Sequence, residues 1–170
     1  GMLGKEYASA LSAAGARVIL FDVADEVRLP EGLRARYFKL DVTDRNAVFA
    51  AVADVVKEYG RIDVLINNAA MNPAPGSKES EKQFAPYEDY PQELWAKELS
   101  VGLSGALFCT QAVIPFMKKQ KSGSIINISS TYGLVAPDNR IYDEGKYKSI
   151  GYATTKGAVL NFTRAWASYL

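Results

Sequence analysis

The stretch Ser149-Ile-Gly-Tyr-Ala-Thr-Thr-Lys-Gly-Ala158 decides how the rest of the chain is interpreted. It opens a segment with helical spacing of apolar residues and places Tyr152 four residues before Lys156. Residues i and i+4 share one helix face, so the phenol and the ammonium can lie together over one cleft. A tyrosine titrates near ~10, and lowering that pKa by about 3 units takes about 4 kcal/mol of differential stabilisation from a nearby cation. Such a pair suits general acid and base work in alcohol–carbonyl interconversion, although the same spacing occurs on many solvated helix faces.

A second stretch, Gly123-Ser-Ile-Ile-Asn-Ile-Ser-Ser130, has the short β-branched run of a buried strand and ends in two hydroxyls. Ligands bind at the C-terminal edge of an open α/β sheet, where Ser129 and Ser130 would lie. A serine there can donate a hydrogen bond to a carbonyl oxygen while the tyrosine handles its proton. The alternative is a serine pair that caps the strand or starts a turn.

Three motifs occur in order along the chain: Asn67-Asn-Ala-Ala70, Ile126-Asn-Ile-Ser-Ser130 and Tyr152-x-x-x-Lys156. Together they resemble the short-chain dehydrogenase/reductase family, and the resemblance covers essentially the whole chain. It implies an α/β fold, a Rossmann-type doubly wound parallel sheet in a three-layer αβα sandwich, with residues 1–170 as part of a single NAD(P)-binding domain. The alternation of strands and helices with short turns supports this fold independently. Relative to the family, we expect the chain to lack the first strand and the C-terminal part.

The resemblance also implies an NAD-dependent oxidoreductase that transfers hydride between nicotinamide and a secondary alcohol or ketone. Ser130 would polarise or position the carbonyl oxygen, so Ser130 and Tyr152 would contact the substrate. Tyr152 would donate the proton in reduction and accept it in oxidation. Lys156 would lower the tyrosine pKa and bind the nicotinamide ribose. Two alternatives stay open: a catalytically weak nucleotide-binding homologue, and an epimerase or dehydratase that recycles bound NAD.

Cofactor binding is expected along the same edge of the sheet. Gly1 and Gly4 belong to a turn that enters a helix predicted over 5–14, and a helix N-terminus suits the cofactor pyrophosphate. Asp22 ends a strand predicted over 16–22 and can bind both ribose hydroxyls, which favours NAD over NADP; the alternative is a loop aspartate. Asn67 is expected to brace the sheet. By resemblance, the remaining cofactor contacts come from Leu3, Asp41, Val42, Asn68, Ala69, Ala70, Ile128, Tyr152 and Lys156.

Two departures from the family concern the site. Gly102 stands where the family has an asparagine that helps to hold a water of a proton relay, and Ser100 or Ser104 is a candidate to hold that water instead. Ser130 and Tyr152 lie 22 positions apart, which is longer than usual in the family. One interpretation is that the added residues form a surface loop without a role in binding. The other is that they line the mouth of the substrate site and suit a hydroxyl-rich or anionic substrate of the sugar or polyol kind. The side chains concerned are Asp138, Asn139, Arg140 and Tyr142.

Helices are predicted over 93–119 and 150–170, and the resemblance implies that they pack against their copies in a homodimer or homotetramer. Residues 71–91 are predicted to be a long loop that borders the substrate mouth or is a solvated insertion. The apolar run over 99–117 is interrupted by polar residues and therefore indicates a buried helix rather than a membrane span.

Composition narrows the classes of partner. The formal net charge is +1, with 20 basic and 19 acidic residues, which gives no support for a nucleic-acid or membrane partner. The chain has no histidine and a single cysteine, Cys109, so no metal site is expected. Cys109 is expected to be a small buried hydrophobe. No signal peptide is visible, and the expected compartment is the cytoplasm. The expected ligands are thus a small-molecule substrate and NAD.

Overall fold

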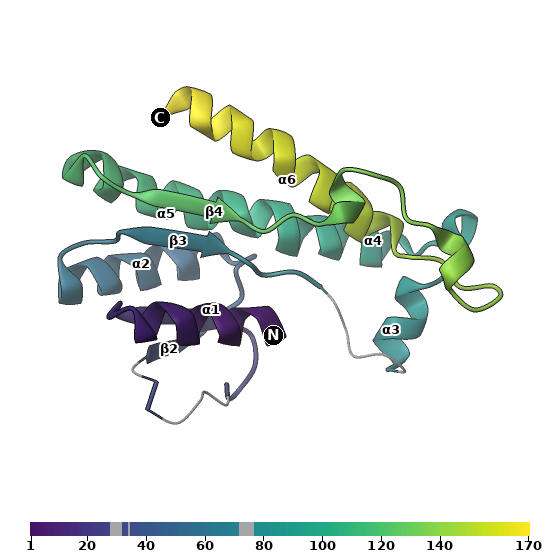
Figure 1. Ribbon diagram of the computed structural model, residues 1–170, viewed down its shortest axis with the longest axis horizontal. Helices are drawn as coiled ribbons and strands as arrows, with labels where there is room; N and C mark the ends of the chain where they lie inside the picture. The colour runs from purple at the N-terminus through teal and green to yellow at the C-terminus, as the bar shows by residue number, and fades with distance from the viewer. Residues whose placement is uncertain (28–31, 34, 72–76) are drawn as a thin grey trace.

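The computed structural model describes residues 1–27, 32–33, 35–71 and 77–170 (Figure 1). The strands are β1 (Val18–Asp22), β2 (Ala35–Lys39), β3 (Val64–Asn67) and β4 (Ser124–Asn127). The α-helices are α1 (Met2–Ala13), α2 (Arg45–Tyr59), α3 (Lys78–Gln83), α4 (Gln92–Leu99), α5 (Gly105–Gln120) and α6 (Ile150–Tyr169). A π-helical turn, η2 (Ser100–Ser104), joins α4 to α5. The 3-10 turns are η1 (Tyr87–Asp89), η3 (Thr131–Gly133) and η4 (Asn139–Ile141).

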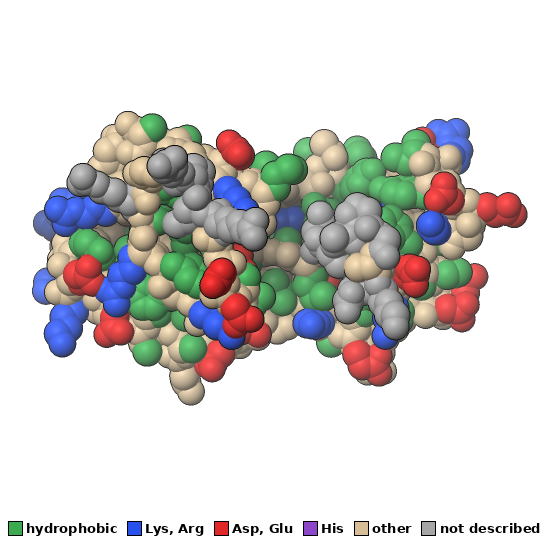
Figure 2. All heavy atoms as spheres, turned by 90° about the horizontal axis from the view of Figure 1, so that it is seen from below, with side chains coloured by type: hydrophobic (Ala, Val, Ile, Leu, Met, Phe, Trp, Pro, Cys, Tyr) green, Lys and Arg blue, Asp and Glu red, His purple; other side chains and the backbone are tan. Residues whose placement is uncertain are grey.

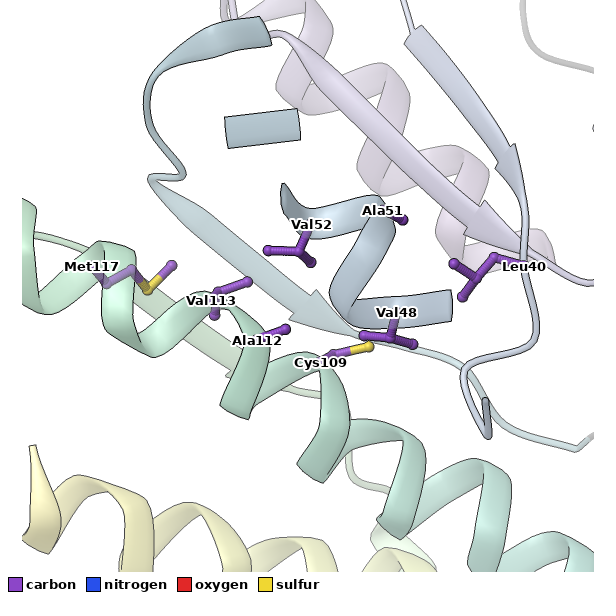
Figure 3. Close-up of a cluster of buried hydrophobic side chains, with 8 residues drawn as sticks. All are labelled: Leu40, Val48, Ala51, Val52, Cys109, Ala112, Val113 and Met117. Atoms are coloured by element: carbon purple, nitrogen blue, oxygen red, sulfur yellow. The ribbon is translucent and has the colours of Figure 1, made fainter. Parts of the chain in front are cut away.

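The strands form two parallel pairs. β1 pairs with β2, with Val18 opposite Ala35, and β3 pairs with β4, with Asn67 opposite Asn127. Among the described residues no hydrogen bonds join one pair to the other. Strands from both pairs run in the same direction in Figure 3, so their C-terminal ends face one side of the molecule. Parallel strands connected through helices confirm the predicted α/β fold class.

The hydrophobic core lies between the sheet and the helices α2 and α5. Val48 on α2 is 0% exposed, and Figure 3 shows it beside Cys109 of α5. Cys109 is buried, which confirms it as a small buried hydrophobe, and burial raises the pKa of its thiol to about 11. The other buried members of this cluster are Leu40, Ala51, Val52, Ala112, Val113 and Met117.

Local sequence signals set the ends of α2. The side chain of Asp44 accepts a hydrogen bond from the backbone N–H of Ala47 at 3.0 Å, so Asp44 is the N-cap. Gly60 ends the helix in the left-handed region with φ 76°, where glycine carries no Cβ penalty. Asn67 braces the sheet as predicted, because its Nδ2 donates to Asn127 Oδ1 at 2.8 Å and to Thr110 Oγ1 at 3.2 Å.

Two of the predicted segments differ from the structure. The single helix predicted over 93–119 is three segments, because the hydrogen-bond register slips into the π-helical turn η2 between α4 and α5. The long loop predicted over 71–91 contains α3, which Ser77 caps through a hydrogen bond from Ser80 N, and the turn η1. Residues 72–76 of that predicted loop lie outside the described residues.

By length and composition alone, the run Gln92–Gln120 could cross a membrane, because it contains an 18-residue window with a mean hydropathy of 1.5. Its inward face supplies buried residues to the core described above. This packing supports its assignment as a buried helix.

The core predicts a matched pair of stability effects. Val48→Ala removes two methyl groups from a fully buried site and should lower the free energy of unfolding by about 2 kcal/mol. Val23→Ala is the control, because Val23 is 62% exposed and its truncation should change stability by less than about 0.5 kcal/mol. Urea unfolding of the natural full-length protein measures both. Equal effects would contradict the assigned core.

Candidate active site

The helix α6 begins at the C-terminal side of the sheet and carries both residues of the predicted pair. Ser149 is its N-cap, and Ser149 Oγ accepts a hydrogen bond from Tyr152 N at 2.9 Å. One turn further on, Lys156 Nζ lies 5.7 Å from the centre of the Tyr152 ring. The prediction that the phenol and the ammonium share one helix face is therefore confirmed.

Lys156 is deeply buried, with 5% of its surface exposed. Its Nζ donates to the carbonyl oxygen of Ile128, directly after β4, at 2.6 Å. Burial lowers the pKa of the Lys156 ammonium. An ammonium has three donors, and this bond uses one of them. Ile128 thus orients the lysine from the end of the neighbouring strand and leaves donors for a ligand.

The two serines after β4 have different partners. Ser129 Oγ donates to the carbonyl oxygen of Lys156 at 2.7 Å and so fastens this segment to α6. Ser130 Oγ accepts from Tyr132 N at 3.2 Å and caps η3, as in the turn-starting alternative. That bond leaves the Ser130 proton available for donation, so the cap and a role as donor are compatible.

The segment α4–η2 packs closely against α6 at two points, and at each point a side chain of one segment lies against a glycine of the other. A Cβ on Gly151 of α6 would overlap the carboxylate of Glu98 in α4. A Cβ on Gly102 of η2 would overlap Cγ2 of Thr155 in α6. Glu98 and Gly102 are four residues apart in α4–η2, and Gly151 and Thr155 are four residues apart in α6. Each helical segment therefore presents its two contact residues on one face. The close packing of α6 therefore requires glycine at position 102.

A small cavity of about 10 Å³ adjoins this contact and has room for about one water molecule. Its lining residues are Ala70, Met71, Glu98, Gly102, Tyr152, Thr155 and Lys156. Thr155 Oγ1 is buried and has no hydrogen-bond partner among the described residues. Neither Ser100 nor Ser104 lines the cavity, and its polar lining residues are Glu98, Tyr152, Thr155 and Lys156.

Sequence reasoning missed Glu98, which is 3% exposed. Its carboxylate accepts hydrogen bonds from Gln83 Nε2 at 2.6 Å, from the Tyr90 hydroxyl at 2.7 Å and from Ser149 Oγ at 2.8 Å. Burial, together with the bond to Glu98, raises the pKa of Tyr90 well above its ordinary value, although the bond to Ser149 opposes this. Glu98 thus joins α3 and the start of α4 to the N-cap of the helix that carries Tyr152.

Sequence reasoning also missed Lys148. Its Nζ lies 4.4 Å from the centre of the Tyr152 ring and 5.9 Å from that of Phe84. Lys148 is half-buried, and burial lowers the pKa of its ammonium, while the negative charge of Glu98 raises it. The only available sequence signal was a lysine four positions before Tyr152, outside the helix. The Tyr152 ring therefore has two lysines near it, Lys148 four positions before it in the sequence and Lys156 four positions after it.

Three of the predicted cofactor residues, Leu3, Gly4 and Asn68, lie at or beside the first turn of α1. The first turn of α1 holds Leu3 and Gly4, and a Cβ on Gly4 would lie 3.3 Å from Asn68 Nδ2 at the end of β3. Gly1 is the N-cap of α1. A helix N-terminus with glycine in its first turn could hold a pyrophosphate.

The remaining predicted cofactor residues follow the strands. Asp22 Oδ1 accepts from Ala24 N at 3.1 Å, and Asp41 Oδ1 accepts from Thr43 N at 2.9 Å. Val42 packs against the start of α5, where a Cβ on Gly105 would overlap it, a contact that the sequence did not predict. Ala69 and Ala70 are exposed after β3. Among the residues that the structure describes, no three His, Cys, Asp or Glu side chains gather as metal ligands.

The contact between Gly102 and Thr155 predicts an effect of unusual sign. Alanine normally stabilises a helical position by about 0.5–1 kcal/mol over glycine. Gly102→Ala should instead destabilise by about 1–3 kcal/mol, because its Cβ overlaps Thr155 Cγ2. Thr155→Ser removes that methyl group, so Gly102→Ala should cost little in the Thr155→Ser background. A double-mutant cycle by urea unfolding of the natural full-length protein measures this coupling. Equal losses in the two backgrounds would refute it.

Comparisons with known proteins show the family of this chain. A family model described as short chain dehydrogenase matches residues 1–170. The chain is 34% identical over 175 residues to a 3-oxoacyl-[acyl-carrier-protein] reductase of Thermotoga maritima, covering 99% of this chain and 63% of that protein. It is 34% identical over 171 residues to a meso-2,3-butanediol dehydrogenase of Serratia marcescens, covering 97% and 60%.

Among solved structures, that of NAD+-bound xylitol dehydrogenase matches with a TM-score of 0.81 at 32% identity, covering 98% of this chain and 60% of that one. The chain thus spans about three-fifths of the length of these relatives. The match along all 170 residues is decisive, and the chain belongs to the short-chain dehydrogenase family.

Proposed function

We propose that the protein is an NAD-dependent oxidoreductase that interconverts a secondary alcohol and a ketone on a small polar substrate of the sugar or polyol kind. The observation that carries this proposal is the Tyr152–Lys156 pair on α6, with the ammonium 5.7 Å from the ring centre and held by Ile128. A phenol beside a buried ammonium at the C-terminal side of a parallel sheet suits proton transfer to a carbonyl oxygen.

Each side chain then has one task. Ser130 donates its free proton to the substrate oxygen and holds it in place. Tyr152 gives its proton to that oxygen in reduction and takes it back in oxidation. Lys156 places positive charge beside the phenol and offers its remaining donors to the nicotinamide ribose. Bound NAD supplies the hydride acceptor or donor, and the protein orients it.

The choice of NAD rests on Asp22 at the end of β1. Its carboxylate can accept from both hydroxyls of an adenosine ribose, and its charge would repel a 2′-phosphate. The first turn of α1 would receive the pyrophosphate, and Asp41, Val42, Asn68, Ala69, Ala70 and Ile128 would contact the remainder. The related xylitol dehydrogenase structure contains NAD+, which supports this choice.

A polar substrate is supported by the residues between Ser130 and Tyr152. The hydroxyl groups of Tyr132 and Tyr142 lie 3.3 Å apart, and burial raises the pKa of Tyr142 to about 12. Asn139 has a structural role instead, because its Oδ1 accepts from Lys148 N. Arg140 pairs with Asp138 in solvent. Xylitol and 2,3-butanediol, named for two relatives, are small polyols.

We also propose a homodimer or homotetramer that packs through 93–119 and 150–170, which the family resemblance supports, and action in the cytoplasm. The alternative of a catalytically weak nucleotide-binding homologue is motivated by Gly102. An epimerase or dehydratase that recycles NAD would share the same tyrosine and lysine. Net NADH production indicates a dehydrogenase, turnover without NADH indicates the recycling enzyme, and cofactor binding without turnover indicates the weak homologue.

The decisive variant is Tyr152→Phe. It removes only the hydroxyl, so kcat should fall at least about 100-fold while the dissociation constant for NADH stays within about twofold. Turnover is followed by NADH absorbance, and binding by NADH fluorescence, with the natural full-length protein. A variant that keeps the wild-type kcat would overturn the assignment of Tyr152 as acid and base.

Cofactor choice gives a separate prediction. Asp22→Ser should lower the ratio of the NADPH to the NADH dissociation constant by about tenfold or more, because it removes the charge that repels the 2′-phosphate. Asp25→Ser is the matched control, because Asp25 is highly exposed and pairs with Lys39. Fluorescence titration with both reduced cofactors measures the ratio. An unchanged ratio in Asp22→Ser would remove Asp22 from the cofactor site.

A further inference from the structure

Lys148 is held in place on both sides of its backbone. Its N–H donates to Asn139 Oδ1 at 3.0 Å, and its carbonyl oxygen accepts from the Tyr87 hydroxyl at 3.1 Å. The next residue back, Tyr147, donates its N–H to the carbonyl oxygen of Phe84 at 3.0 Å. Residues 84–87 and 139–148, which are far apart in the sequence, thus converge around Lys148. Figure 1 shows the segment before α6 beside α3.

The Lys148 ammonium has no ionic partner within the described part of the chain. The other two cations of the same insert are paired: Arg140 with Asp138 at 2.8 Å, and Lys146 with Asp143 at 3.1 Å. The carboxylate that acts on Lys148 is Glu98, whose oxygens are already occupied by Gln83, Tyr90 and Ser149. Lys148 therefore keeps a half-buried charge that the described protein groups do not neutralise by direct contact.

The position of this charge is the second part of the argument. The ammonium lies 4.4 Å from the centre of the Tyr152 ring, which belongs to the proposed acid and base. Holding a cation out of water has an electrostatic cost, which its contacts with the aromatic rings of Tyr152 and Phe84 offset in part. An anion that arrives with the substrate would complete the pairing, and ion pairs are stronger in a partly dry site.

We propose that Lys148 binds an anionic group of the substrate, a carboxylate or a phosphate, that lies within a few bonds of the reacting alcohol carbon. The inference rests on the proposed function and narrows its substrate class from polar alcohols to hydroxy acids, sugar acids or phosphorylated polyols. Figure 2 shows the lower side of the molecule hollowed near its middle.

The test compares charged and neutral alcohols of similar shape on the natural full-length protein with saturating NAD. The pairs are butane-2,3-diol with 3-hydroxybutyrate, and glucitol with gluconate and with glucitol 6-phosphate. Wild type should show a kcat/KM about 10- to 100-fold higher for the anionic member of at least one pair. The carboxylate and phosphate arms distinguish the two kinds of anion.

Lys148→Met keeps the aliphatic stem and removes the charge, so it should abolish that preference, measured as the ratio of kcat/KM for the anionic alcohol to kcat/KM for the neutral one. Lys148→Arg should retain most of the preference. Lys146→Met is the matched control, because Lys146 lies two residues away and is paired with Asp143. NADH affinity should be unchanged in all three variants. Binding of the same anions to the protein–NADH complex is measured by fluorescence, independently of turnover.

Two results would overturn the inference. One is a wild-type protein that binds NADH but neither binds these anions more tightly than Lys148→Met nor prefers them as substrates. The other is equal loss for charged and neutral alcohols in Lys148→Met, which would indicate that Lys148 only supports the Tyr152 ring. Failure of the proposed function is distinct, because wild type would then fail to bind NADH or to oxidise any of the alcohols.

Discussion

The contact between α4–η2 and α6 determines where Tyr152 and Lys156 of the candidate site lie. Glu98 fills the space over Gly151, and Thr155 fills the space over Gly102, so the two helical segments approach more closely than side chains at both positions would allow. Tyr152 follows Gly151 directly, and Lys156 follows Thr155 directly. The position of the phenol and the ammonium over the sheet edge is therefore set by the same two size-matched pairs that pack the helices.

Burial of Glu98 adds an electrostatic requirement to this contact. A buried carboxylate is tolerated only where donors replace its water, and three side chains from separate segments do so. One of them is Ser149, whose oxygen also accepts from Tyr152 N. The bonds to Gln83 and Tyr90 extend the same network to the segment that precedes α4. Losing one donor would leave charge unsatisfied next to the first turn of α6, so the segment before α4 and the helix α6 are held as one unit.

Patterns within a few residues predicted much of this arrangement. The four-residue spacing placed Tyr152 and Lys156 on one face, and the β-branched run placed Ser130 after a strand. The sequence patterns did not predict Glu98 and Lys148, because their partners are remote in the sequence. Ser149 lies 51 positions from Glu98, and Phe84 lies far from Lys148. The π-helical turn was not predicted either, because the spacing of apolar residues cannot distinguish one helix from two helices joined by a change of hydrogen-bond register.

Gly102 shows how such a register change alters the interpretation of a single residue. Taken alone, a glycine within a helix lacks a side chain and destabilises the helix by about 1 kcal/mol relative to alanine. In the structure it faces the methyl group of Thr155, a residue 53 positions later in the chain, and a cavity that Glu98 and Lys156 also line. The polar groups around this cavity come from two helical segments that only the glycine allows to meet. The glycine is therefore better understood as a condition for that polar environment than as a missing part of the site.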